Sequence, residues 1–411
     1  MAALQPVRGT KDLIGEDQRK HRHIIDTARR ISALYGFEEW QTPIFEATEV
    51  FSRTLGDTSD VVTKEMYSFP DRGGDSLTLR PEGTAGVARA LVSNGLTQSL
   101  PQKVFYAGPM FRYERPQRGR QRQFHQIGAE LIGPSEPLAD AEVIAMGWHV
   151  LRELGMADGV VLEINTLGDL ESRNAYRAAL MEYFTAHRDA LSDDSQMRLE
   201  KNPMRILDSK DAGDKKLVAD APTITPYLSS SAAHFYDSVK RHLDVFRVLY
   251  RENPRIVRGL DYYSHTAFEF VSDNLGAQST VLAGGRYDGL IAEMGGPATP
   301  AVGWAAGIER IAELICPLAA PTVKVAVMPV GDESESAGIS VLNFLRDFKI
   351  SAELAYRGNL KKRMERANKI GAKWALFIDV NRPEGAPVQI KNLETGQQDE
   401  ILLADFIDRV R

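Results

Sequence analysis

Apolar and polar positions near the start of the chain follow the period of a helix. Between residues 17 and 35, apolar side chains recur every three to four residues, as at Ile24, Ala28 and Ile31, and Gly36 follows them. This spacing predicts an amphipathic helix that ends at the glycine. The same reasoning predicts strands at 37–42, 66–69, 77–80, 103–114, 123–133 and 160–166, and helices at 46–55, 84–94 and 140–154. Hairpins mixed with helices favour an α+β fold with a mainly antiparallel sheet of about six or seven strands, flanked by helices.

The pattern changes near residue 168. Residues 170–253 have helical periodicity and no clear strand, which predicts a helical insertion. Strand patterns return at 263–272 and 279–283, and we expect a helix to begin near residues 303–308. A segment rich in Pro and Ala then leads to alternating strands and helices, the pattern of an α/β domain. The predicted domains are residues 1–169 together with 251–318, a helical insertion at 170–250, and a C-terminal α/β domain at 322–411.

The composition narrows the class of protein. Over 411 residues, 50 Lys and Arg face 56 Asp and Glu, and the formal net charge of −6 argues against binding by bulk positive charge. The single cysteine, Cys316, rules out an internal disulfide framework and a Cys-rich zinc site, and it fits a reducing cytoplasm. The eight histidines show no zinc-type spacing, so we expect no fixed metal site in the protein. No apolar run is long enough to span a membrane, and residues 1–15 lack the apolar core of a secretory signal. We therefore expect a cytoplasmic protein that does not bind a membrane.

The two predicted strands around residues 103–133 carry the densest set of polar side chains. Side chains alternate across a strand, so Arg112 and Glu114 share one face of the first strand. Phe124, Gln126 and Glu130 share one face of the second strand, and the apolar residues between them point the other way. Buried polar residues in register are costly unless they are paired. This face is therefore a candidate ligand site.

The loop that joins these strands is rich in arginine, with Arg115, Arg118, Arg120 and Arg122. Guanidinium groups are planar and permanently charged, which suits them to phosphate oxygens. A solvated, charged hairpin tip is the alternative for such a loop taken alone. The polar face on the following strand favours the phosphate interpretation.

Further clusters have both a ligand-binding and a structural interpretation. Glu82 and Thr84, at a strand-to-helix turn, either hold an ammonium group or cap the helix. The tyrosines of the segment 258–263 either orient a polar ligand or pack in the core. Glycines at 283–289 permit close approach of the backbone to a ligand. Neither the dinucleotide fingerprint nor the P-loop is present, so arginines and a sheet would have to hold any nucleotide.

Together these segments resemble the class II aminoacyl-tRNA synthetases, and most closely the histidyl-tRNA synthetases. Residues 37–60 resemble motif 1, residues 111–130 resemble motif 2, and residues 303–310 resemble motif 3. Residues 258–263 and 283–289 match the two signatures that distinguish the histidyl enzymes. The resemblance covers essentially the whole chain, and residues 322–411 are similar to the anticodon-binding domain of several class II enzymes.

The resemblance implies a role for each matching residue. For ATP it implies Arg112 at the α-phosphate, Arg310 at the γ-phosphate, Glu114 and Phe124 at the adenine, and Arg120 and His125 near the phosphates. For histidine it implies Glu82, Thr84 and Gln126 at the α-amino group, Glu130 and Tyr263 at the imidazole with Tyr262 beside them, and Arg258 between the carboxylate and the α-phosphate. Arg112 and Arg258 would be the catalytic residues. Arg115 and Gln117 would contact the acceptor end of the tRNA.

The implied activity is activation of L-histidine with ATP and Mg²⁺, followed by transfer of histidine to tRNA(His). The resemblance also implies a homodimer built on residues 37–55 and tRNA contacts from the cation-rich segment 357–369. A non-catalytic regulatory subunit of a histidine-biosynthetic phosphoribosyltransferase is the alternative. Such paralogues lack the anticodon-binding domain. Residues 378–385 depart from the family pattern, which affects only the anticodon contacts.

Overall fold

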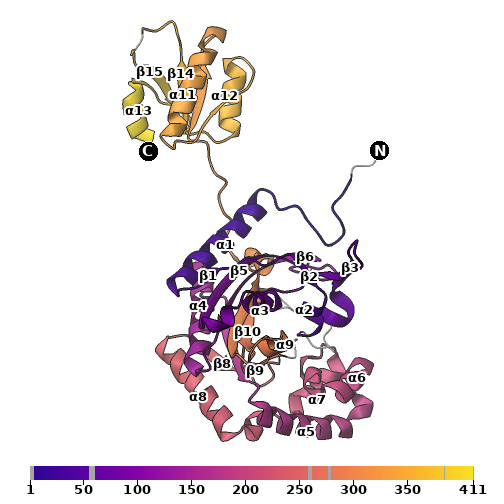
Figure 1. The fold of residues 1–411 in the computed structure, drawn as a ribbon. Helices are drawn as coiled ribbons and strands as arrows, with labels where there is room; N and C mark the ends of the chain where they lie inside the picture. Colours follow the sequence, from indigo (N-terminus) through magenta and orange to yellow (C-terminus); the bar gives the residue numbers. More distant parts are fainter. Residues whose placement is uncertain (1–3, 55–60, 258–261, 276–278, 384, 411) are drawn as a thin grey trace. The chain divides into compact units, whose positions relative to one another are not determined.

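The computed structural model describes residues 4–54, 61–257, 262–275, 279–383 and 385–410 (Figure 1). Contacts divide the chain into two units, Met1–Leu318 and Ala319–Arg411. None of the helices in the described ranges combines the length and the apolar character needed to cross a bilayer.

The first helix forms where the apolar spacing predicts it. Helix α1 spans Glu16–Leu34, and its first turn is acidic, which stabilises a helix N-terminus. Its buried face contains Ile24, Ala28 and Ile31, which are fully removed from solvent. These residues join the main apolar core of the first unit, so α1 is fixed against the sheet.

In the described part of the first unit, eight strands form one sheet in the order β1-β5-β6-β11-β10-β9-β7-β8. The strands are β1 (Glu38–Glu39), β5 (Gln102–Phe111), β6 (Gln123–Ile132), β11 (Ala301–Gly307), β10 (Thr280–Arg286), β9 (Ser264–Val271), β7 (Val161–Thr166) and β8 (Tyr250–Glu252). Only the outer pairs β1–β5 and β7–β8 are parallel. The predicted α+β class is confirmed. The sheet is wider than predicted because β8, three residues long, is too short to show a period, and because β11 was expected to be a helix.

One predicted element is wrong. The sequence favours a helix from about residue 303, but Ala301–Gly307 is the strand β11, and helix α10 spans only Ile308–Leu314. Strand β11 pairs with β6 on one side and β10 on the other. The pattern of its small residues resembles that of a helix. Pairing with a strand on each side, in the middle of the sheet, makes the segment a strand instead.

Helices cover both faces of this sheet (Figure 1). On one face, α1, α4 (Pro137–Glu153), α8 (Ser230–Val245) and α10 share a core with the sheet residues Ile127, Phe268 and Trp304. On the other face lie α2 (Glu49–Ser52), α3 (Thr84–Ser93) and α9 (Leu290–Glu293). A small sheet of β2 (Phe45–Ala47), β4 (Ser76–Leu79) and β3 (Tyr67–Pro70) belongs to this region. The predicted hairpin at 66–80 is confirmed as β3 and β4.

Between β7 and β8, the helices α5 (Leu170–Ala186), α6 (Asp193–Lys201) and α7 (Ala212–Asp220) enclose an apolar core of their own, which includes Tyr176 and Phe184. Asp169 joins the two ends of this segment, because its carboxylate accepts hydrogen bonds from Ser172 and from Ser229. Helix α8, which follows Ser229, packs against α4 instead. The predicted boundaries of the insertion, 170–250, remain a prediction.

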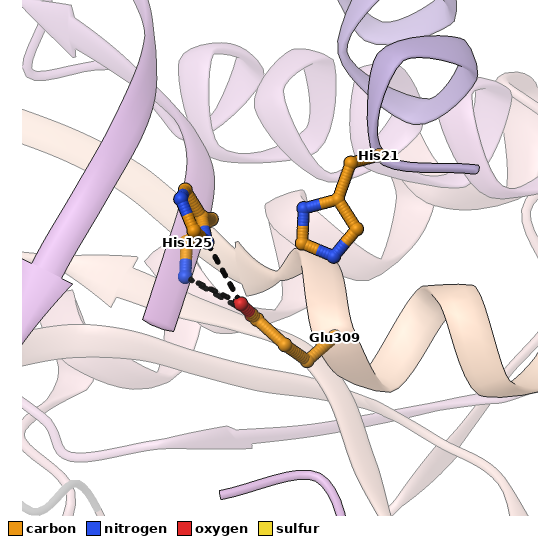
Figure 2. A group of neighbouring side chains, drawn as sticks. All are labelled: His21, His125 and Glu309. Atoms are coloured by element: carbon orange, nitrogen blue, oxygen red, sulfur yellow. Dashed lines mark hydrogen bonds and ion pairs between the residues drawn. The ribbon is translucent and has the colours of Figure 1, made fainter. Parts of the chain in front are cut away.

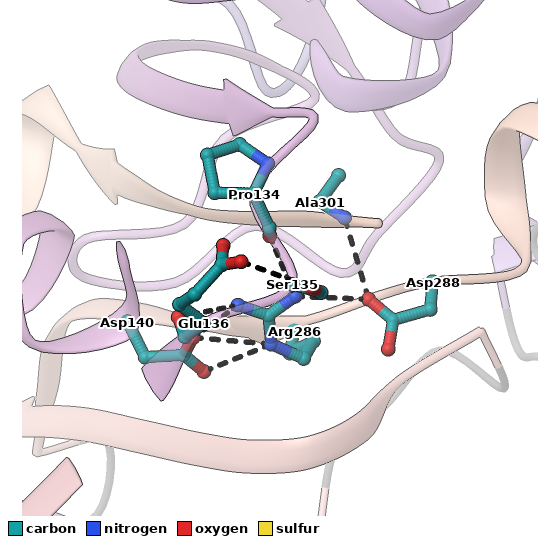
Figure 3. Close-up of polar contacts among 7 residues, drawn as sticks. All are labelled: Pro134, Ser135, Glu136, Asp140, Arg286, Asp288 and Ala301. Atoms are coloured by element: carbon teal, nitrogen blue, oxygen red, sulfur yellow. Dashed lines mark hydrogen bonds and ion pairs between the residues drawn. The ribbon is translucent and has the colours of Figure 1, made fainter. Parts of the chain in front are cut away.

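A buried ion pair fixes the end of β10 to the start of α4 (Figure 3). Arg286 and Asp140 are both essentially inaccessible to solvent, and Nε of Arg286 donates to the two Asp140 carboxylate oxygens at 3.2 and 3.0 Å. Arg286 also donates to the carbonyl of Pro134 and to Asp288. The charge is thus fully hydrogen-bonded, as a buried cation requires. The pair fixes the backbone position of Tyr287, the next residue.

The second unit is an α/β domain. Its described residues form a sheet in the order β13 (Ala352–Leu354), β12 (Val325–Pro329), β14 (Trp374–Ile378), β15 (Val388–Asn392) and β16 (Gln398–Ile401). The helices are α11 (Glu335–Asp347), α12 (Leu360–Lys369) and α13 (Leu403–Val410). The Asn359 side chain caps α12 by accepting a hydrogen bond from the Lys362 amide. Apart from β16, these strands and helices follow the predicted pattern.

Candidate active site

A cavity of about 260 Å³ lies in the first unit, over the polar face of β5 and β6. It is lined by most of the site residues predicted from sequence: Glu82, Thr84, Arg112, Glu114, Arg120, Phe124, Gln126, Glu130, Tyr262, Tyr263 and Arg310. These residues come from positions more than 200 residues apart in the chain. The fold therefore gathers into one place side chains that sequence reasoning could only group by pattern.

Strand pairing explains why these side chains share a face. β5 and β6 pair over their whole length, with Met110 opposite Phe124 and Gly108 opposite Gln126. Strand β5 ends at Phe111. The prediction put Arg112 and Glu114 within this strand, but they lie just beyond its end. Gln126 presents a buried Oε1 that has no hydrogen-bond partner among the described residues. A ligand that donates a hydrogen bond would satisfy this oxygen.

Three arginines form the cationic side of the cavity. The Nε of Arg112 donates to the carbonyl of Pro81 at 2.9 Å, and its guanidinium lies 5.3 Å from the centre of the Phe124 ring. Arg310 donates to the carbonyl of Thr280 at 2.7 Å. Each guanidinium is thus oriented by the protein before a ligand binds.

The third arginine, Arg120, forms an ion pair of 2.8 Å with Glu114. Burial, and then the charges of Arg120 and Arg112, lower the pKa of Arg310 from its usual value. Cations that are held near one another in this way favour a polyanionic ligand, because bound negative charge would relieve both their repulsion and their desolvation.

Glu130 lies at the opposite, closed side of the cavity and is only 1% exposed. Its carboxyl group accepts hydrogen bonds from Thr84 at 2.7 Å, from Tyr106 at 3.3 Å and from the Tyr287 hydroxyl. Burial raises the pKa of Glu130 from 4.5 to about 8. The carboxyl group therefore holds a proton at neutral pH until a suitable partner arrives.

Glycines make room for the groups around Glu130. Gly83 and Gly128 lie on either side of the Tyr106 ring, so closely that a methyl group at either position would overlap the ring. A methyl group at Gly303 would overlap the Glu130 carboxylate itself. The shape of the pocket thus depends on missing side chains as much as on those present.

Glu82 and the paired tyrosines form the third wall. Glu82 accepts hydrogen bonds from the amide of Ala85 at 2.8 Å and from the hydroxyl of Tyr262 at 3.2 Å, and burial raises its pKa. The rings of Tyr262 and Tyr263 lie 4.6 Å apart. Arg173 of helix α5 donates to the backbone carbonyl of Tyr263 at 2.7 Å, which fixes that segment to the helical insertion.

Tyr106 and Tyr287 are functional candidates that sequence reasoning missed. Tyr106 precedes Arg112 by an even number of positions on an extended segment, so strand alternation places it on the same face. Tyr287 belongs to the glycine-rich segment 283–289, which was recognised as a signature without a role for the tyrosine. The alternation could have identified Tyr106, but nothing local indicates that Tyr287 reaches Glu130.

Four predicted residues are not among those that line the cavity. His125 alternates with Phe124 and Gln126 along β6, and its Nδ1 lies 2.8 Å from Glu309, which itself lines the cavity. The role of His125 near the phosphates stays a prediction. Arg115 and Gln117 are exposed in the loop. Arg258 lies outside the described residues.

The loop that carries these residues is a tight hairpin. Gln117 and Arg120 exchange two backbone hydrogen bonds, of 3.1 and 2.9 Å, and Gly119 adopts the positive φ of 69° that the turn needs. An ion pair of 2.8 Å between Arg118 and Glu313 attaches the tip to α10. The loop is thus held at the mouth of the cavity, beside Arg310.

Comparisons with known proteins identify the arrangement. The family model described as histidyl-tRNA synthetase matches residues 9–311, and that described as anticodon binding domain matches residues 324–411. The histidine–tRNA ligase of Gluconacetobacter diazotrophicus is 65% identical over 403 residues, which cover 98% of this chain and 97% of that protein. That of Gluconobacter oxydans is 60% identical, over 99% of this chain and 98% of that protein.

A solved structure agrees with these sequence matches. Apo histidyl-tRNA synthetase of S. aureus superposes with a TM-score of 0.83 at 35% identity, over 99% of this chain and 100% of that one. A Bacillus halodurans protein described as an ATP phosphoribosyltransferase regulatory subunit/histidyl-tRNA synthetase shares the fold alone, with a TM-score of 0.68 at 20% identity over 92% of this chain and 99% of that one. The family match spans most of the chain, and the cavity holds the side chains that the resemblance assigned to the substrates. The chain therefore belongs to the histidyl-tRNA synthetase family.

Proposed function

We propose that this chain is a histidine–tRNA ligase that uses ATP to activate L-histidine and then transfers it to tRNA(His). The observation that carries this proposal is the polarity of one cavity, with an arginine cluster at one side and a buried, hydroxyl-bound carboxyl group at the other. The arginine side suits a triphosphate, and the carboxyl side suits an imidazole. One cavity of about 260 Å³ is lined by both sets of residues, which supports binding of the two ligands next to each other.

ATP binds at the arginine side, as its magnesium complex. Arg112 takes the α-phosphate, since its contacts with Pro81 and Phe124 orient its guanidinium at the cavity wall. Arg310 takes the γ-phosphate end, and the adenine stacks on Phe124. Charge-assisted contacts between guanidinium and phosphate are strong and geometrically specific.

Histidine binds at the Glu130 side. The imidazole donates a hydrogen bond to Glu130 and meets the hydroxyl of Tyr263, so that both ring nitrogens are satisfied. Glu82 and the unpartnered Oε1 of Gln126 receive the α-ammonium group. A site built from buried polar groups rejects isosteres strongly, because it leaves those groups unpaired when the wrong side chain enters.

The chemistry follows from this placement. A carboxylate oxygen of histidine attacks the α-phosphorus of ATP, and the bond to pyrophosphate breaks, which leaves histidyl-adenylate. Two anions must approach each other, so the preorganised charge of Arg112 lowers the barrier. We assign Arg258 to the same task from the sequence resemblance. The terminal ribose hydroxyl of the tRNA then attacks the carbonyl carbon, and AMP leaves.

The partners follow from surfaces outside the cavity. Arg115 and Gln117 at the mouth contact the acceptor end of tRNA, and the cationic helix α12 of the second unit contacts tRNA phosphates. A homodimer forms through the segment 37–55, where Ile44 and Phe45 are 44% and 54% exposed. Sedimentation as a monomer at micromolar concentration would contradict the dimer.

The alternative, a regulatory subunit of a phosphoribosyltransferase, is less well supported. Full-length relatives at 60–65% identity are histidine–tRNA ligases, and the match to the anticodon-binding domain covers residues 324–411. The protein with the mixed description shares only the fold. The cavity also retains Arg112 and Arg310, which a protein that does not bind ATP has no need to keep.

ATP–pyrophosphate exchange, measured with each amino acid in turn, tests the proposal. We expect exchange with histidine only. Arg112→Ala should abolish most of it, whereas Arg115→Ala, at an exposed position of the loop, should leave exchange intact and reduce only transfer to tRNA. Exchange with another amino acid, or its absence with histidine, would contradict the proposed function.

A further inference from the structure

Two histidines and a glutamate converge in a second pocket, behind the arginine side of the cavity (Figure 2). They are His21 of α1, His125 of β6 and Glu309 of α10. One ligand atom from each lies within 4.8 Å of those of the other two. The proposed reaction assigns no step to His21 or to Glu309. It joins three elements that are far apart in the sequence.

The contacts within the group leave a polar atom unsatisfied. His125 donates to Glu309 from its backbone amide, and its ring Nδ1 lies 2.8 Å from the Glu309 carboxylate. The ring of His21 meets the ring of His125 edge-on, with 5.2 Å between the centres. His21 is only 4% exposed, yet its Nδ1 has no hydrogen-bond partner among the described residues. A buried nitrogen without a partner is costly, so something should bind it.

We propose that His21, His125 and Glu309 form a binding site for a divalent transition-metal ion, with Zn²⁺ as its preferred occupant. Two imidazoles and one carboxylate are a ligand set that zinc uses when it keeps a fourth position open. In a tetrahedral site, neighbouring ligand atoms lie about 3.3 Å apart at the usual zinc–ligand distances. The observed separations therefore need only small side-chain rotations. Mg²⁺ is a poor fit, because it prefers oxygen ligands.

The surroundings offer an entry route and space for the fourth ligand. A pocket of about 120 Å³ opens beside the three side chains and can hold a water molecule on the metal. Lys11 and Asp17 also line this pocket, and they neutralise each other in an ion pair of 2.8 Å. Glu313 lines it too and is paired with Arg118 at 2.8 Å, so Glu309 supplies the negative charge that attracts a cation.

The site would link metal binding to the ATP side of the active site. Phe124 and Gln126, the two neighbours of His125 in the chain, line the large cavity. Arg310, which follows Glu309, lines it as well. A metal ion on His21, His125 and Glu309 would fasten α1 to both segments. The inference does not depend on the proposed function, because metal binding is measured without any turnover.

The test is a titration of the full-length chain, after treatment with a chelator, with Zn²⁺ and separately with Mg²⁺ by calorimetry. A Cys316→Ser background removes the one thiol, which could bind zinc elsewhere. We expect one Zn²⁺ per chain and a higher melting temperature with zinc. His21→Ala should weaken zinc binding more than about 100-fold, since even outer partners of metal ligands contribute 10–100-fold. Mg²⁺ should give no binding at this site.

His23→Ala is the matched control, because His23 lies on the same helix but is exposed. His21→Gln keeps size and polarity and serves if the alanine variant does not fold. Co²⁺ in place of zinc should give the visible absorption bands of a tetrahedral site. Equal zinc binding in the His21 and His23 variants, or no zinc binding in the parent, would overturn the proposal and leave the pocket to water.

Discussion

Replacing Glu130 by glutamine tests whether its buried carboxyl group is protonated. Burial raises the pKa of Glu130 from 4.5 to about 8 in the folded protein. Above pH 4.5 the unfolded chain releases this proton, whereas the folded chain keeps it until about pH 8. The folded state therefore loses stability relative to the unfolded state as the pH rises through this window.

The size of the effect follows from the shift. Proton linkage gives a loss of roughly 3–4 kcal/mol in the free energy of unfolding between about pH 5 and pH 8. Glutamine has the shape of glutamate but no such proton. Its amide can still pair with the hydroxyls of Tyr106 and Tyr287. The Glu130→Gln variant should therefore lose less stability than the parent over the same window, by about this amount.

Urea unfolding at several pH values, followed by tryptophan fluorescence, measures the difference. Trp374→Phe in both proteins removes the only tryptophan of the second unit, so that the signal reports the first unit. Glu38→Gln, at an exposed position, should reproduce the pH dependence of the parent. If the parent and Glu130→Gln show parallel curves, the reasoning about the proton is refuted.

Three other substitutions test the shape, the support and the charge of the site. Gly128→Ala should displace Tyr106 from Glu130 and lower kcat/KM for histidine by about 100-fold, in a steady-state exchange assay. Arg286→Met should cost about 3–5 kcal/mol in urea unfolding, because the charge of Asp140 is left buried without its partner. Arg310→Ala should lower kcat/KM for ATP by about 100–1000-fold while histidine binding, measured by calorimetry, is retained.

Each of these has a matched control. Gly289→Ala meets no atom closer than 3.9 Å and should behave like the parent, and equal losses in both glycine variants would contradict the role of Tyr106. Arg22→Met removes an exposed ion pair and should cost little. Arg118→Ala removes a cation outside the cavity lining, so a loss as large as that of Arg310→Ala would argue against specific phosphate binding.

Strand alternation made much of the site predictable. Arg112, Glu114, Phe124, Gln126 and Glu130 were grouped on one face from their two-residue spacing alone, and the structure places them around one cavity. The same spacing, applied consistently, places His125 on the opposite face. Its assignment to the phosphates came from the resemblance and stays a prediction.

Contacts between distant segments were not predictable. The bond from Tyr287 to Glu130 depends on the pairing of β10 with β11 and of β11 with β6, which no local pattern specifies. The strand β11 was mistaken for a helix for the same reason, since its small residues carry no strand period and only its neighbours make it a strand. The pairing of His21 with His125 and Glu309 likewise appears only once α1 lies against the sheet.

The hydrogen bonds of Asp169 bring together the two ends of the helical segment that follows it. The chain enters the segment at Asp169 and leaves it at Ser229, and these two residues are in direct contact. The two ends of this stretch of about 60 residues thus meet at one junction, and Arg173 adds a second contact, to the backbone carbonyl of Tyr263. A shortened chain, joined directly from 169 to 229, would show how far this segment supports the Tyr263 wall of the cavity, because it would lack Arg173.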